Sequence, residues 1–283
     1  MSAQDPFAAV AVLPGVPEAV DRAREAVDRL RGHRVLRRRS TEVTGECVLR
    51  GARASAALEG ADVPLALFRS EQLWEAGDDA PRADRLIAQG ALRVTAELGP
   101  LAQSWGQAPL QVIARLHALA AVGTVPERWL GRPRDDDVED VEVGGGDGLD
   151  GPPGAPPGAS EVSARLATLA RMLVEARTGA PAVVVGAVVH GELLALRPFV
   201  RGNGLVARAA ERLVLVSRGL DPKSVSAPEV GHAELGSEPY LAALRGYVSA
   251  TPDGIGRWVG HCADAVVLGA REGLAVCEAL ARG

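Results

Sequence analysis

Apolar residues recur at helical spacing along most of this 283-residue sequence, and this periodicity constrains the fold more than any other feature. In Val16–Leu30, for example, the apolar side chains fall on one face of a helix. The same pattern predicts helices over Glu42–Leu58, Arg82–Leu98, Leu110–Val122, Glu161–Arg177, Pro239–Ala250 and Ile255–Ala281. We therefore expect an all-α fold.

One segment leaves the choice between helix and strand open. Ala182–Val189 (AVVVGAVV) is rich in β-branched residues, which favour strands. The sequence that follows it, HGELLALRPF, is helix-like, and a lone strand in a helical chain would have no partner. We favour a buried helix.

Composition argues against several functions. The net charge of −5 argues against non-specific nucleic-acid binding, and only 3% of the residues are aromatic, too few for stacking on single strands. The N-terminus lacks the features of a signal peptide, and the longest apolar stretch, Ala180–Val189, is too short to span a bilayer. We expect a cytoplasmic protein that binds neither nucleic acid nor membranes.

The three cysteines, Cys47, Cys262 and Cys277, form no CxxC or Cys/His motif. Their spacing indicates neither a zinc site nor a disulfide framework, so we expect buried free thiols and no metal. The segment 131–158 (GRPRDDDVEDVEVGGGDGLDGPPGAPPG) is acidic and then rich in Gly and Pro. Few of its residues can be buried, which predicts a flexible loop.

The segment Arg197–Arg208, RPFVRGNGLVAR, holds the most informative chemistry. Its Gly-Asn-Gly triplet lies where one helix is expected to end and another, reaching Val216, to begin. Glycines there let backbone amides turn inward as an anion-binding nest. The guanidinium groups of Arg197, Arg201 and Arg208 suit phosphate. The alternative is a plain interhelical loop with solvated arginines.

Gly202–Ala207 also satisfies GxGxxA, the dinucleotide-binding pattern, with Ala182–Val189 as its strand and Asp221 as a ribose-binding acid. That pattern needs its first glycine directly after the strand, and here a dozen residues intervene. An NAD(P)-dependent oxidoreductase is therefore the weaker alternative.

RPFVRGNGLVAR resembles the signature of the Fic/Doc (Fido) family, HPFx[D/E]GNGRxxR. The matching positions are Pro198, Phe199, Gly202, Asn203, Gly204 and Arg208, whereas Arg197, Arg201 and Leu205 depart from the pattern. A second segment, Ser55–Gly60 (SAALEG), is similar to the inhibitory helix pattern of the family, [S/T]xxxE[G/N]. The two segments also occur in the order that the family has.

The resemblance implies a Fic helical fold with an N-terminal helical extension: residues 1–98 carry the inhibitory-type helix, and residues 99–283 form the core. It also implies a target-aligning flap near Trp129–Val143. Family members transfer AMP from ATP to a hydroxyl of a target protein, with a motif histidine as base and a motif acid holding Mg²⁺.

Carried over residue by residue, the resemblance gives Gly202, Asn203 and Gly204 to the phosphates and Arg208 to the γ-phosphate. Arg201 stands at the metal-binding acid and borders the same nucleotide site. The autoinhibitory positions are Ser55, Glu59 and Gly60, and the resemblance implies that Glu59 pairs with Arg208.

The departures bear directly on mechanism. Arg197 occupies the position of the base, and a guanidinium keeps its proton at neutral pH. Arg201 replaces the acid and repels Mg²⁺. His190, the nearest histidine, lies about 10 Å away along a helix, and the other histidines (His33, His117, His232 and His261) are expected to be structural or superficial.

These departures favour a catalytically impaired homologue, a pseudoenzyme that binds ATP or another nucleotide without Mg²⁺ and acts through an unidentified protein partner. A vestigial pocket closed by Glu59 and Arg208 is nearly as well supported. An active nucleotidyl- or phosphoryl-transferase with an altered mechanism comes third.

Overall fold

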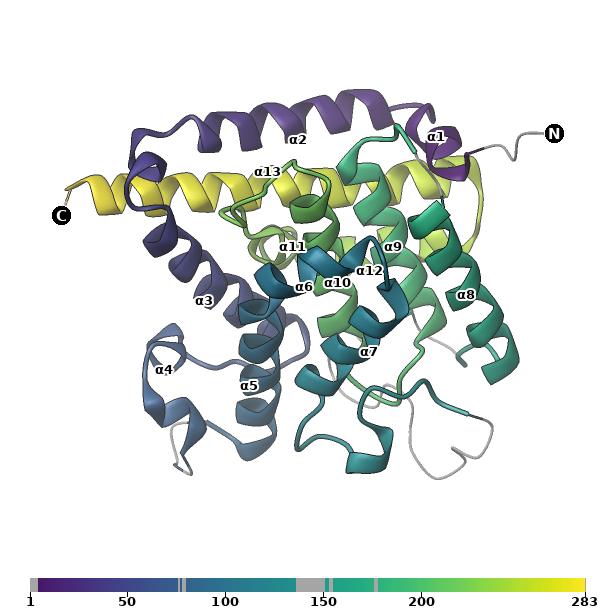
Figure 1. The fold of residues 1–283 in the computed structure, drawn as a ribbon, viewed down its shortest axis with the longest axis horizontal. Helices are drawn as coiled ribbons and strands as arrows, with labels where there is room; N and C mark the ends of the chain where they lie inside the picture. The colour runs from purple at the N-terminus through teal and green to yellow at the C-terminus, as the bar shows by residue number, and fades with distance from the viewer. Residues whose placement is uncertain are drawn as a thin grey trace.

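Helices account for nearly all regular structure in this protein (Figure 1). The computed structural model describes residues 5–75, 77, 80–135, 151–152, 155–175 and 178–282. Within these residues there is no strand, and the only β feature is an isolated bridge between Val122 and Val125. The expectation of an all-α fold is confirmed.

The helices follow one another along the chain with short connections. In order, they are α1 (Pro6–Ala11), α2 (Val16–Arg31), η1 (Arg34–Arg37), α3 (Ser40–Leu58), α4 (Leu65–Phe68), η2 (Glu71–Trp74), α5 (Arg82–Ala96), α6 (Leu98–Trp105), α7 (Pro109–Ala120), η3 (Glu127–Trp129), α8 (Ala159–Glu175), α9 (Ala182–Leu196), α10 (Asn203–Ser217), α11 (Pro228–Leu235), α12 (Ser237–Val248) and α13 (Pro252–Arg282). Each helix predicted from periodicity is present with its ends shifted by three residues or fewer, whereas α1, α4, α6, α11 and the short 3-10 helices η1, η2 and η3 were missed.

The α9–α10 pair forms the centre of the molecule, and the other helices pack around it. The long α13 crosses the structure with α2 alongside it, and α11 and α12 also pack against α13 (Figure 1). On the other side, α3 packs against α5 and α11, while α6 and α7 cover α10. One hydrophobic core extends from Phe7 to Cys277. The division into 1–98 and 99–283 stays a prediction.

The β-branched segment Ala182–Val189 is the first half of α9, as the buried-helix interpretation predicted. Almost every residue of α9 is buried, so β-branched side chains pack on all its faces instead of forming a strand. The dinucleotide interpretation required a strand here, and it is wrong for that reason. None of the described helices is both long and apolar enough to cross a membrane.

Two other expectations concern the cysteines and the segment 131–158. Cys47, Cys262 and Cys277 are buried free thiols, as predicted. Most of the predicted flexible loop, residues 136–150 and 153–154, lies outside the described residues, as does the second half of the expected flap. Arg134, on one side of it, donates a hydrogen bond to the turn between α9 and α10, and Pro157, on the other side, accepts one from Arg134.

Candidate functional site

The turn between α9 and α10 carries the sequence motif. Arg197, the C-cap of α9, has left-handed backbone angles (φ 43°, ψ 63°), which are uncommon for a residue other than glycine. The Asn203 side chain accepts a hydrogen bond from Phe199 N and donates one to Phe199 O, both at 2.9 Å. Gly202 is left-handed (φ 79°) and forms the N-cap of α10. The turn is therefore fixed by its own residues, and it leads into the positive end of the α10 dipole.

His117 supports this turn from α7. Its ring stacks on Phe199, with centroids 3.9 Å apart and nearly parallel planes. Nδ1 accepts a hydrogen bond from Gly131 N at 2.9 Å, which leaves Nε2–H to donate to the Arg201 carbonyl at 3.1 Å. Burial lowers the pKa of His117 to about 4, so the ring is neutral at physiological pH. This histidine is structural, as expected, but its contact with the motif was not foreseen.

Arg134 holds the turn from the other side. It is buried, and its Nε donates to the Arg197 carbonyl at 2.9 Å, while its backbone N donates to the Pro198 carbonyl at 2.7 Å. Its Nη2 donates to the carbonyls of Pro157 and Leu196. One side chain thus joins the two ends of the Gly/Pro-rich segment to the motif. Sequence reasoning missed it, because an arginine in an acidic, loop-like stretch looks solvent-exposed.

The C-terminal end of α3 places Glu59 next to the motif. Glu59 is the C-cap of α3, and Gly60 follows with φ 85°. Gly60 N donates to Ala57 O and Ala61 N donates to Ala56 O, both at 3.0 Å, which is the Schellman arrangement that a C-terminal glycine favours. The role of Gly60 in the structure is therefore to end the helix directly after Glu59.

Arg208 on α10 brings the two motif segments together. Its Nη2 lies 2.5 Å from Glu59 Oε1 and 3.1 Å from the Ser55 carbonyl, and its Nε donates to Ser55 Oγ at 2.9 Å. The Arg208 side chain is fully buried, and that of Glu59 is 8% exposed. Burial disfavours the charged guanidinium, but Glu59 and the Tyr240 hydroxyl together outweigh this effect and raise the pKa of Arg208.

Ser55, Glu59 and Arg208 therefore meet as the family resemblance implied, although their inhibitory role stays a prediction. Leu205 is buried, and Arg201 is half-buried.

Arg197 is buried at the C-terminal end of α9. It lines a cavity of about 510 Å³ with Arg165, Glu192 and Tyr247, and Arg201, Gly202 and Arg208 are not among the lining residues. A side chain at Gly151 would collide with the aliphatic part of the Arg197 side chain, so the Gly151 backbone packs directly against that part. The convergence of three guanidinium groups on one anion stays a prediction, and the structure shows Arg197 on the wall of this cavity.

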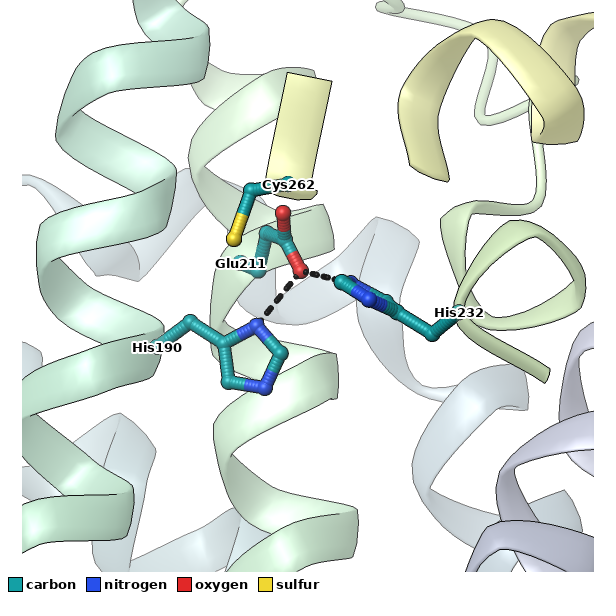
Figure 2. Close-up of side chains that lie close together, drawn as sticks. All are labelled: His190, Glu211, His232 and Cys262. Carbon is teal, nitrogen blue, oxygen red and sulfur yellow. Dashed lines mark hydrogen bonds and ion pairs between the residues drawn. The ribbon is translucent and has the colours of Figure 1, made fainter. Parts of the chain in front are cut away.

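His190, the histidine nearest to the motif in sequence, lies in the core. Its Nδ1 is 2.8 Å from Glu211 Oε2 (Figure 2). Its Nε2 is 2.6 Å from the Tyr240 hydroxyl. Both ring nitrogens of His190 therefore have buried partners, and the expectation that His190 does not act as a base stays a prediction.

No protein-family model matches this sequence, and none of the curated proteins matches it. Solved structures are similar in fold. A Fic family protein from Desulfovibrio desulfuricans G20 superposes with a TM-score of 0.70 at 19% identity, over 94% of this chain and 75% of that chain. Fic-1 from C. elegans gives 0.61 at 16% identity, over 90% and 70%. A Fic domain containing signaling protein from Bacteroides thetaiotaomicron VPI-5482 gives 0.61 at 14% identity, over 92% and 98%.

Proposed function

Because this chain has the all-α Fic fold, we propose that it binds the phosphate chain of ATP or a related nucleotide at the start of α10 and transfers AMP poorly or not at all. The observation that carries this proposal is the buried pair of Arg208 and Glu59. A fully buried guanidinium needs an anion, and a carboxylate now supplies it. A phosphate that reaches the same place would pair with Arg208 once Glu59 is displaced.

The turn offers further donors for an anion. Gly202 is left-handed and is the N-cap of α10, so the positive end of the helix dipole lies at this turn and suits an anion. Arg201 adds a positive charge at the same turn. These groups need no metal, since the arginine supplies the charge that a cation would otherwise bring.

The catalytic impairment follows from two positions. At the base position, Arg197 lines the cavity of Arg165 and Glu192, and its guanidinium cannot accept a proton at neutral pH. At the acid position, Arg201 provides no oxygen ligand for Mg²⁺, which prefers carboxylates. Loss of a general base alone lowers the rate by about 10²–10⁴-fold.

The test is calorimetric titration of ATP into the wild type and into Glu59→Gly, each with Mg²⁺ and with EDTA. We expect binding that persists in EDTA and tightens in Glu59→Gly. Glu97→Gly is a matched control, because Glu97 is also a C-cap glutamate with similar backbone angles (φ −86°, ψ −3°) and lies on α5. The absence of binding in both the wild type and Glu59→Gly would mean that the pocket is vestigial and would refute the proposal.

The second part of the proposal, that the protein transfers AMP poorly or not at all, is tested by incubation with ATP labelled at the α-phosphate. We expect no protein labelling, even in Glu59→Gly with Mg²⁺. Labelling that requires Mg²⁺ and that Gly202→Glu abolishes would show an active transferase instead.

A further inference from the structure

Four donor side chains converge in the core, each from a different helix. His190 lies on α9, Glu211 on α10, His232 on α11 and Cys262 on α13 (Figure 2). One ligand atom from each, namely a histidine nitrogen, a carboxylate oxygen or the cysteine sulfur, lies within 4.8 Å of all the others. Glu211 Oε2 is 2.8 Å from His190 Nδ1 and 2.9 Å from His232 Nε2. All four residues are buried.

We propose that these four side chains form a closed, structural Zn²⁺ site. Two imidazoles, a carboxylate and a thiolate are the donors that zinc prefers, and structural zinc sites are tetrahedral with four protein ligands. Ligand bonds of about 2.0–2.3 Å give ligand–ligand separations of roughly 3.3–3.6 Å. To reach this geometry, the two contacts to Glu211 lengthen by about 0.5 Å, and any pair near the 4.8 Å limit shortens by about 1.2 Å.

The partners of the second ring nitrogen of each histidine also fit a zinc site. Histidines that bind a metal generally donate the other ring N–H to a fixed partner. His190 Nε2 lies 2.6 Å from the Tyr240 hydroxyl, and His232 Nδ1 lies 3.2 Å from His261 Nε2. Each histidine therefore directs one nitrogen to the centre of the cluster and has a polar partner for the other.

Charge balance favours a divalent cation. A carboxylate and a thiolate together neutralise Zn²⁺, so the loaded site adds no net charge to the core. The rings of Tyr240 and Trp258, both fully buried, pack within 6 Å of His190 and exclude water. With four protein ligands and no open position, the ion would join helices and would not activate water.

The position of the cluster links it to the motif helix. Glu211 follows Arg208 by three residues on α10. The Arg208 guanidinium is also close enough to the Tyr240 hydroxyl to interact with it electrostatically. A metal bound by Glu211 would fix α10 relative to three other helices and thereby the position of Arg208. This inference stands whether or not a nucleotide binds.

The test measures metal in the full-length protein purified from medium supplemented with zinc or with cobalt. We expect one ion per chain, X-ray absorption of the zinc form with one sulfur and three nitrogen or oxygen ligands, and a thiolate-to-cobalt charge-transfer band in the cobalt form. Cys262→Ser should abolish the band and weaken binding by more than about tenfold, since loss of a ligand exceeds the effect of losing an outer partner. Cys277→Ser is the matched control, because Cys277 is a buried free thiol on the same helix.

Wild-type protein without stoichiometric metal in either medium would overturn the proposal, and the four side chains would then form only an internal hydrogen-bond network. A charge-transfer band that survives Cys262→Ser would also overturn it. The wild-type metal content and absorption spectrum decide the question even if Cys262→Ser fails to fold.

Discussion

Arg208 Nη2 and Glu59 Oε1 lie 2.5 Å apart in the interior, although 149 positions separate the two residues in the sequence. Glu59 is the C-cap of α3 and Arg208 is in the second turn of α10, so this ion pair joins the two helices that carry the motif segments. Removing one partner of a buried pair is more damaging than removing both, because the remaining charge has no counterion.

Glu59→Ala should therefore reduce the free energy of unfolding by about 3 kcal/mol. Urea denaturation measures this change. Glu97→Ala, at the matched C-cap of α5, should change it by less than about 0.5 kcal/mol. Addition of tripolyphosphate should restore part of the stability of Glu59→Ala, since the anion would pair with Arg208 in place of the carboxylate. An equal loss in both variants would contradict the prediction.

Arg201→Asp should convert nucleotide binding from metal-independent to Mg²⁺-dependent, because a carboxylate at this position supplies the oxygen ligand that Mg²⁺ prefers. The measurement is calorimetric titration of ATP in the Glu59→Gly background, with Mg²⁺ or EDTA. Arg38→Asp makes the same change of charge at an exposed position on the C-cap of η1 and should leave the metal dependence unaltered. Binding by Arg201→Asp that is the same in Mg²⁺ and EDTA would count against this role of position 201.

Arg134→Ala should loosen the motif turn, because the Arg134 side chain donates hydrogen bonds to the carbonyls of Arg197, Leu196 and Pro157. Leaving buried carbonyls unpaired costs about 1–3 kcal/mol for each group, so we expect a loss of at least 2 kcal/mol in unfolding free energy. Faster amide hydrogen exchange in residues 197–203 should accompany it. Arg132→Ala, at an exposed position two residues earlier, is the control and should show neither effect.

The stability of the protein should fall as the pH drops below 6.5. The pKa of His117 is about 4 in the folded protein, against 6.5 for the free side chain, because burial disfavours the charged ring. The unfolded chain therefore binds more protons between these values, and the contribution of His117 is complete above pH 6.5 and is lost as the pH falls towards 4. The loss is up to about 1.4 kcal/mol for each pH unit. His117→Gln should reduce the slope of unfolding free energy against pH by up to about 1.4 kcal/mol per pH unit, which corresponds to one proton. An unchanged slope would contradict the prediction.

Tyr240→Phe should weaken zinc binding by about 10–100-fold, as is typical when the partner that orients a metal-bound histidine is removed. The hydroxyl lost is the one 2.6 Å from His190 Nε2. Competition with a chelator of known affinity measures the effect. Tyr247→Phe is the control, because Tyr247 is also largely buried but its hydroxyl contacts Val188 and Glu192 instead. Similar affinities in both variants would argue against a role for Tyr240.

Much of the local structure could be predicted from the sequence. Apolar periodicity gave the principal helices, and glycines gave the two turns that matter for the site, after Glu59 and before Asn203. These features depend on residues close together in the chain, whose spacing and backbone freedom act locally. The pairing of Arg208 with Glu59 came from the family resemblance, since periodicity does not say which helices meet.

Tertiary packing decided the rest. α9 is apolar on every side, so its sequence has no preferred face that could direct His190 towards a partner. Glu211, His232 and Cys262 reach the same point from three other helices, and no sequence spacing between them indicates a site. Arg134 and His117 likewise acquire their roles only where the turn passes them. The sequence by itself determined which segments are helical and where they end, because those choices are local. The convergence of distant polar side chains was decided only by the tertiary structure, because it depends on how whole helices pack.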